Sequence, residues 1–145
     1  YYGCMLTRLP QGLAGDDHED PSAMDILLRG LGCDVRSWPF KGECCGGSKT
    51  IVDPEVTHDL SAKIMERAVM EGARAIITSC PLCQMNLDLL PHTGPVTRLL
   101  PVLFISEVFE LALFGTLSGK AKHFIPPGAV GKARAIGMAG PKGAR

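Results

Sequence analysis

Five of the six cysteines in this chain form one uneven pattern that could hold a metal. Cys4 stands alone, Cys44 and Cys45 are adjacent, and two residues separate Cys80 from Cys83. Thiolates are soft ligands that bind zinc and iron–sulfur clusters in preference to hard metal ions. Five thiols drawn from three parts of the chain therefore predict a thiolate-bound metal centre, and we favour an iron–sulfur cluster.

The Cys80–Cys83 pair lies where a short apolar run is expected to turn into a helix. Pro81 suits the first helical position, so Cys80 lies near the cap and Cys83 one turn further. Both sulfurs then face the positive end of the helix dipole, which lowers a thiol pKa and favours thiolate. A C-x-x-C pair alone does not distinguish a metal site from a redox dithiol or from two core cysteines.

The adjacent pair Cys44–Cys45 helps to distinguish a single-ion site from a cluster. Neighbouring side chains diverge, so they do not fit two corners of one small ion but can reach different irons of a cluster. Gly46 and Gly47 let the backbone approach closely and offer N–H groups to sulfur. Two buried loop cysteines, or a strained disulfide between neighbours, are the alternatives.

Cys4 gains its significance from the other four, because a single cysteine at a strand end is more often a core residue. Five thiolates exceed the four of a structural zinc site or an ordinary cubane cluster. Either one cysteine is spare or the cofactor is unusual. Cys33 has no partner at a ligand-like spacing, and we expect it to be a buried apolar residue.

These cysteines must be positioned by an alternation of strands and helices. That order predicts an α/β fold with a small parallel sheet of about four strands and flanking helices. Ligand sites in such sheets gather at the C-terminal strand ends, where the cysteine-rich loops are expected. We expect strands at residues 1–3, 33–38, 75–78 and 102–105, and helices from Ser22 to about residue 30, from Asp53 to about 71, from Cys80 to about 90 and from Ser106 to about 114. In the second helix, Val56, Leu60, Ile64, Ala68 and Val69 would form the buried stripe.

Composition limits the possible partners and surroundings. Lysine plus arginine and aspartate plus glutamate are both 15, so the net charge is zero and nothing indicates a nucleic-acid partner. No apolar run reaches the roughly 18 residues of a membrane span. The modest cysteine content and the lack of a recognisable signal peptide favour a reducing cytoplasm.

We expect one domain over residues 1–127 and a flexible tail over 128–145, which is rich in glycine, alanine and basic residues. Tyr1 and Tyr2 have the character of the last part of a strand. We therefore expect the domain to be the second half of a longer subunit.

Three motifs together resemble the cysteine-rich CCG domain, in particular the C-terminal domain of the heterodisulfide reductase subunit that carries two such domains. They are Tyr-Tyr-Gly-Cys at 1–4, Lys-Gly-Glu-Cys-Cys-Gly-Gly at 41–47 and Cys-Pro-Leu-Cys-Gln-Met-Asn-Leu-Asp at 80–88. The segment 102–113 is also similar to the one that follows in that family. The combined motif is specific, whereas its separate pieces are not.

The resemblance implies an iron–sulfur oxidoreductase whose five motif cysteines bind a noncubane [4Fe–4S] cluster. The cluster would reduce a disulfide, the CoB–CoM heterodisulfide or a related one, to thiols. The implied partners are a second CCG domain, in the same polypeptide or through a homodimer, an iron–sulfur electron-donor subunit and a small disulfide substrate. Such a domain would be active only within a complex, and an aerobically purified protein could be empty. The catalytic and metal-binding residues by position are Cys4, Cys44, Cys45, Cys80 and Cys83, with Gly46 and Gly47 also contacting the cofactor.

Two other functions stay open. One is a non-catalytic electron-transfer module of a dehydrogenase complex, and the other is a structural zinc domain using four of the five cysteines. Only one copy of the motif is present, so the chain alone would supply a single cluster.

Overall fold

The computed structural model describes residues 1–8, 15–89, 99–118 and 123. The tail expected at 128–145 lies outside these residues. Two parallel strands, β1 (Ile76–Thr78) and β2 (Val102–Phe104), form the sheet, with Ile76 opposite Val102 and Thr78 opposite Phe104. The helices of the described part are α1 (Gly3–Thr7), α3 (Ala23–Gly30), α4 (Pro54–Met70), α5 (Pro81–Leu89) and α6 (Ile105–Phe114), with short 3-10 turns η1 (Pro39–Gly42) and η2 (Gly47–Lys49).

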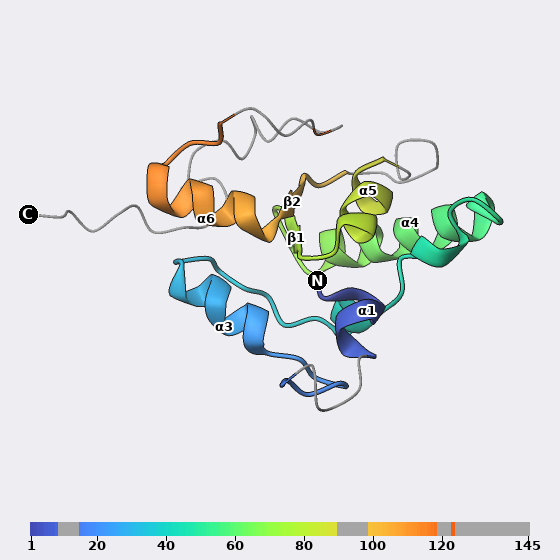
Figure 1. The fold of residues 1–145 in the computed structure, drawn as a ribbon, viewed down its shortest axis with the longest axis horizontal. Helices are drawn as coiled ribbons and strands as arrows, with labels where there is room; N and C mark the ends of the chain where they lie inside the picture. Colours follow the sequence, from blue (N-terminus) through green and yellow to red (C-terminus); the bar gives the residue numbers. More distant parts are fainter. Residues whose placement is uncertain (9–14, 90–98, 119–122, 124–145) are drawn as a thin grey trace, which may run out of the picture.

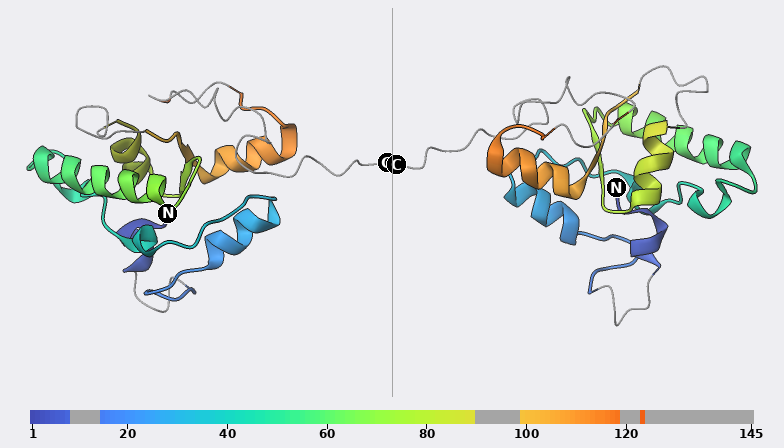
Figure 2. Two further views of the ribbon diagram at one scale, coloured as in Figure 1. Left: turned by 180° about the vertical axis from the view of Figure 1, so that it is seen from behind. Right: turned by 45° about the horizontal axis from the view of Figure 1, so that its top comes forward.

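The small sheet separates two apolar cores. α4 and α5 lie on one flank, and α3 and α6 lie together on the other (Figures 1 and 2). Side chains alternate between the faces of a strand, so Ile76 and Val102 belong to the first core while Leu103 belongs to the second. Cys45 and Cys83 are part of the first core and Cys33 is part of the second.

The expected α/β class is confirmed, but four strands were predicted and the described residues contain two. Residues 1–3 are not a strand, because α1 begins at Gly3 directly after the two tyrosines. The backbone nitrogen of Tyr1 nevertheless donates to the Ile77 carbonyl at 2.9 Å, so Tyr1 lies against the edge of β1 that β2 does not occupy.

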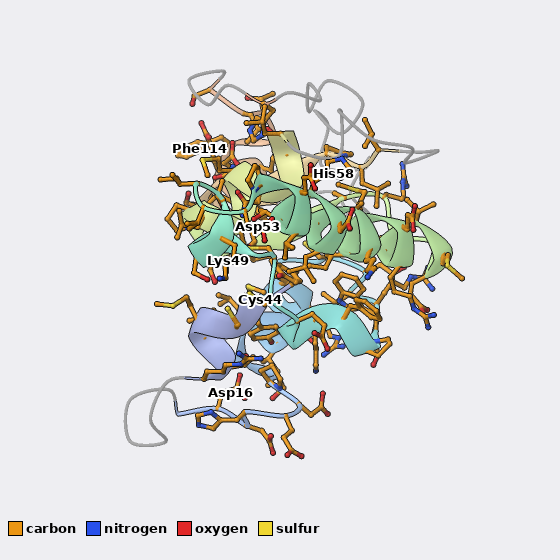
Figure 3. All side chains as sticks on the ribbon, turned by 90° about the vertical axis from the view of Figure 1, so that its right-hand side faces the viewer. Asp16, Cys44, Lys49, Asp53, His58 and Phe114 are labelled. Carbon is orange, nitrogen blue, oxygen red and sulfur yellow. The ribbon has the colours of Figure 1, made fainter. Side chains whose placement is uncertain are left out.

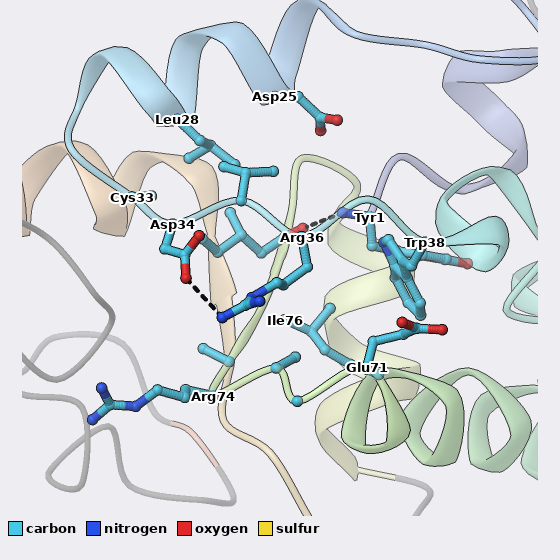
Figure 4. Close-up of a pocket in the computed structure, with 16 residues that line it drawn as sticks. Tyr1, Asp25, Leu28, Cys33, Asp34, Arg36, Trp38, Glu71, Arg74 and Ile76 are labelled. Atoms are coloured by element: carbon cyan, nitrogen blue, oxygen red, sulfur yellow. Dashed lines mark hydrogen bonds and ion pairs between the residues drawn. The ribbon is translucent and has the colours of Figure 1, made fainter.

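The segment 33–38 is not part of the sheet, although Trp38 at its end is extended, with φ −155° and ψ 148°. A cavity of about 280 Å³ lies between this segment and β1, lined by Val35 and Arg36 on one side and by Ala75 and Ile76 on the other (Figure 4). A strand requires ladder hydrogen bonds to a neighbour. Among the described residues, no backbone hydrogen bond joins the segment to β1, so the strand predicted at 33–38 was wrong.

The helix starts follow local signals to different degrees. Asp53 caps α4 as expected, because its side chain accepts from the Val56 N–H at 3.3 Å, and Pro54 takes the first helical position. Ser106 does not cap α6. The Glu107 carboxylate accepts from the Phe104 N–H at 2.7 Å instead, so the helix begins one residue earlier, at Ile105. None of the helices in the described ranges is both long enough and apolar enough to cross a membrane.

Candidate metal centre

Four of the five motif sulfurs meet as two pairs. The Cys4 thiol donates to Cys44 Sγ at 3.4 Å, and a hydrogen bond joins the Sγ atoms of Cys45 and Cys83, which are 3.3 Å apart. Cys4 belongs to α1, Cys83 to the first turn of α5, and Cys44 and Cys45 to the loop between the 3-10 turns. Figure 3 shows Cys44 between α1 and α4. The structure therefore brings these four distant cysteines together in two pairs, and the adjacent side chains diverge to different partners.

The fifth sulfur adjoins the second pair. Cys80 is the residue before α5, and after the larger effects of the Cys45 hydrogen bond and of burial, a hydrogen bond with Cys80 also raises the pKa of Cys83. Cys45 and Cys83 are buried, whereas Cys4, Cys44 and Cys80 are half-buried. The site therefore has a closed side within the first core and a side that solvent or a partner can reach.

The thiols of the second pair share one proton unequally. The hydrogen bond with Cys83 lowers the pKa of Cys45 to about 6, helped by the Gly47 N–H and the Asn86 amide. The same hydrogen bond, followed by burial, raises the pKa of Cys83 well above its usual range. In the first pair, burial and then the hydrogen bond to Cys44 raise the pKa of Cys4 to about 11. Cys45 is therefore the preformed thiolate.

The loop carrying Cys44 and Cys45 directs its amides toward sulfur. The Gly46 N–H donates to Cys44 Sγ at 3.3 Å, and the Gly47 N–H donates to Cys45. Amide dipoles aimed at thiolates stabilise their negative charge. The expectation that the two glycines offer N–H groups to sulfur is confirmed.

The carbonyls of the same loop accept hydrogen bonds from polar side chains of α4 and α5. The Thr57 hydroxyl donates to the Gly46 carbonyl at 3.1 Å, and the Ser61 hydroxyl donates to the Cys45 carbonyl at 3.2 Å. The Asn86 amide also donates to the Cys45 carbonyl, at 3.4 Å, and lies 3.7 Å from Cys45 Sγ. These contacts fix the orientation of both peptide groups.

These bonds explain why the buried stripe expected on α4 was wrong in part. Ile64 and Ala68 are buried as predicted, but Val56 is 42 % exposed while Thr57 and Ser61 are fully buried. Polar groups can be buried when they are hydrogen-bonded, and here the loop carbonyls supply the acceptors. Apolar periodicity alone carries no signal for such residues.

Glycine is required at two close approaches to the site. Gly46 has φ +78°, and a Cβ there would come within 2.9 Å of the Thr57 Cα. Gly3 has φ +72°, and a Cβ there would lie 2.9 Å from Cys83 Sγ. The small residues therefore let α4 approach the loop and let the start of α1 approach the sulfurs.

Besides Thr57 and Ser61, the pattern of cysteines missed Asn86 and Tyr1. Asn86 lies three residues after Cys83, hence on the same face of α5, and this spacing was the available signal. Tyr1 is 6 % exposed and its hydroxyl donates to the Glu43 carbonyl at 2.7 Å, next to the adjacent cysteines. Nothing in the local sequence distinguishes its role from that of Tyr2.

The donor set fits a thiolate-bound multinuclear centre. Two thiolates on one tetrahedral metal atom lie about 3.8 Å apart for metal–sulfur bonds of about 2.3 Å. The separations of 3.4 Å and 3.3 Å are near this value within each pair. Within the described ranges, no three or more His, Cys, Asp or Glu side chains gather as a single-ion site. The sulfurs thus offer two pairs rather than one tetrahedral set.

Comparisons with known proteins agree with this picture. The model of a family described as a cysteine-rich domain, CCG, matches residues 1–88, more than half of the chain. The chain is also similar to the 8-methylmenaquinol:fumarate reductase membrane anchor subunit of Wolinella succinogenes, with 26 % identity over 117 residues. That match covers 78 % of this chain and 41 % of the relative, so the chain spans less than half of that protein's length.

Proposed function

The chain belongs to the CCG cysteine-rich domain family, and from this premise we propose that it binds an iron–sulfur cluster and transfers electrons within a larger oxidoreductase complex. Cys4, Cys44, Cys45, Cys80 and Cys83 would hold the cluster. When bound, it supplies single electrons to an acceptor. The chain's own residues hold the metal, orient the loop amides toward sulfur and exclude water from one side.

The observation that carries the proposal is the division of the adjacent cysteines between two partners. Cys44 contacts Cys4 and Cys45 contacts Cys83, although one peptide bond joins Cys44 to Cys45. This arrangement suits two metal atoms better than one, because each pair of sulfurs could bind a different metal atom. A multinuclear cluster is the thiolate cofactor with that property.

The similarity to a membrane anchor subunit of a fumarate reductase supports a place in a multi-subunit complex. We propose that the half-buried side of the site, at Cys4, Cys44 and Cys80, faces the electron-exchanging partner or a substrate. The buried side at Cys45 and Cys83 is closed by the first core. An electron-carrying role requires only that one side be approachable.

The finer proposal is a noncubane [4Fe–4S] cluster that reduces a small disulfide to two thiols, with a second CCG domain opposite. It is supported by the presence of all five motif cysteines around one site. Reduction consumes two electrons and two protons per disulfide. The donor would be an iron–sulfur partner subunit.

Anaerobic purification followed by iron and acid-labile sulfide analysis tests the cluster. We expect about four irons and four sulfides per chain, with a paramagnetic resonance signal that is lost in Cys45→Ser and Cys80→Ser. Cys33→Ser, in the other core, is the matched control and should keep full iron content. Zinc without sulfide would replace the proposal by a structural zinc domain.

The reaction is tested separately on the loaded protein. Reduced protein mixed with a small disulfide and monitored for free thiols should form two thiols per disulfide if the domain is a reductase. Electron exchange with a partner and no thiol formation would leave the cluster proposal standing and identify an electron carrier.

A further inference from the structure

The hydroxyl of Tyr1 is a polar group inside the sulfur site that the cysteine pattern does not account for. The side chain is 6 % exposed, and its hydroxyl donates to the Glu43 carbonyl at 2.7 Å. Glu43 directly precedes Cys44 and Cys45. The phenol thus contacts the backbone of the loop from which both pairs take one sulfur.

We propose that Tyr1 is a positioning residue of the metal centre, tying the loop with Cys44 and Cys45 to the segment that leads into Cys4. Its effect on a cluster rests on the proposed function. The tie itself is a property of the metal-free chain.

The ring is held from several sides, so the hydroxyl has a fixed place. The backbone nitrogen of Tyr1 donates to the Ile77 carbonyl at 2.9 Å, which anchors the residue to β1. The Trp38 ring lies 6.2 Å away at an interplanar angle of 52°. A Cβ on Gly3 would lie 3.4 Å from Tyr1 Cε1, so the turn into α1 packs directly against the ring. Because the ring is held rigidly against β1, its hydroxyl can fix the position of the loop that carries Cys44 and Cys45.

The environment keeps the phenol neutral. Burial, and then the charges of Cys83, Cys45, Cys44 and Cys4, raise the pKa of Tyr1 far above its usual range. A neutral hydroxyl donates a hydrogen bond without adding a second negative charge beside the Cys45 thiolate. Loss of the hydroxyl would leave the Glu43 carbonyl without this donor.

Tyr2 provides a matched comparison in the neighbouring residue. It is 3 % exposed, and its hydroxyl donates to Asp25 Oδ1 at 3.1 Å. The Tyr2 hydroxyl oxygen also accepts a hydrogen bond from the Asp25 N–H at 2.9 Å. Tyr2 belongs to the core that contains Cys33, whereas Tyr1 belongs to the core that contains Cys45. Loss of either hydroxyl therefore removes buried hydrogen bonding, but in different cores, each of which contains its own cysteine.

The test is cysteine alkylation in the metal-free protein, resolved by mass spectrometry, for Tyr1→Phe and Tyr2→Phe. We expect Tyr1→Phe to speed labelling of Cys44 and Cys45 by roughly threefold to tenfold, the effect of one net hydrogen bond, with Cys33 unchanged. Tyr2→Phe should speed labelling of Cys33 and leave Cys44 and Cys45 unchanged.

Two results would overturn the proposal. One is a Tyr1→Phe protein in which Cys44 and Cys45 label as in the wild type. The other is an equal increase at Cys33, which would mean a general loss of stability rather than a local tie.

The loaded protein supplies a second measurement, the rate of iron release to a chelator. Tyr1→Phe should release iron faster than both wild type and Tyr2→Phe, and equal rates in all three would contradict the proposed effect on the cluster. If the wild type binds no iron, the proposed function fails while the alkylation pattern still decides the role of Tyr1. If the wild type binds iron and Tyr1→Phe labels normally, the role of Tyr1 fails alone.

Discussion

Cys45 and Cys83 form the most strongly perturbed pair of side chains in the site, because one proton lies between two buried sulfurs. The proton rests on Cys83, which leaves Cys45 as a thiolate above about pH 6. A thiolate is the form that binds metal. The apo protein is thus prepared for loading at neutral pH at this position.

Removal of the Cys83 thiol should raise the lowered pKa of Cys45 again. In metal-free Cys83→Ala, we expect the pKa of Cys45 to rise from about 6 toward its ordinary value of 9.0, because the hydrogen bond that stabilises the thiolate is lost. Thiolate absorbance followed against pH measures the shift, with Cys33→Ala as the control that should leave the titration unchanged. A Cys45 pKa near 6 in Cys83→Ala would contradict the shared-proton account.

The same pair predicts how stability depends on pH. The pKa of Cys45 is depressed in the folded chain, so its stabilising effect is present above the ordinary pKa of 9.0 and is lost as the pH falls through about 6. The opposite shift of Cys83 removes stability only above its own ordinary value. Urea midpoints of the metal-free protein should therefore rise between pH 6 and 9, and this rise should be absent in Cys45→Ser.

The Thr57 hydroxyl should contribute more to the free energy of unfolding than the hydroxyl of an exposed threonine. Thr57→Val keeps the shape of the side chain but leaves the Gly46 carbonyl without its donor, which costs about 1–3 kcal/mol when the acceptor is buried. Thr116 is exposed, so Thr116→Val is the control and should change the free energy of unfolding little. Equal effects of the two substitutions in urea denaturation would show that the loop does not depend on Thr57.

At the residue scale, the sequence predicts best where the residue type itself carries the chemistry. The cysteine spacing led to the expectation that distant thiols meet, and four of them do contact one another in the structure. Thr57, Ser61 and Asn86 were not identified, because a polar side chain becomes part of a site only through the tertiary partner it meets. Tyr1 was expected at the end of a strand that the structure does not contain, and that expectation said nothing of its hydroxyl.

At the scale of elements, the loop between η1 and η2 depends on the left-handed conformation of Gly46 and on the space beside it. Gly72 has a similar φ of +73°, but a Cβ added there would meet no heavy atom within 4 Å. Gly72→Ala should therefore cost only the backbone strain of about 1–2 kcal/mol. Gly46→Ala should cost more, because the added carbon also meets the Thr57 backbone at 2.9 Å.

Urea denaturation compares these two glycine variants, and iron content gives an independent readout. Gly46→Ala should lose iron as well as stability, whereas Gly72→Ala, at the end of α4, should keep its iron. If Gly72→Ala were the more damaging change, the packing of α4 against the loop would not be the reason for the glycine.

Elements were predicted well where a local signal defines them and poorly where a neighbour defines them. Asp53 and Pro54 begin α4 because capping involves residues close in sequence. The segment 33–38 was predicted as a strand, yet within the described part of the chain it makes no backbone hydrogen bond to β1, from which a cavity separates it. Strand pairing is a tertiary property, so the number of strands could not be read from residue patterns alone.

At the scale of the whole molecule, the two cores share one sheet of two short strands, which should make them unfold together. Leu87 lies in the first core and Leu111 in the second, both at most 1 % exposed. Replacement of either leucine by alanine should cost about 2–5 kcal/mol through lost burial and a cavity. Because the sheet is common to both, either variant should speed the alkylation of Cys33 and Cys45 alike.

This result would differ from that of the two tyrosine variants, whose effects are expected to stay local. A Leu111→Ala protein that labels faster at Cys33 only would mean that the cores open independently. The sheet would then be a boundary between two units rather than a shared support.

One peptide group connects Cys44 to Cys45, and the two sulfurs leave it in different directions. A displacement of this backbone segment that moves Cys44 away from Cys4 therefore also changes the place of Cys45 relative to Cys83. The half-buried pair and the buried pair share one short piece of backbone, which ties the open part of the centre to the enclosed part.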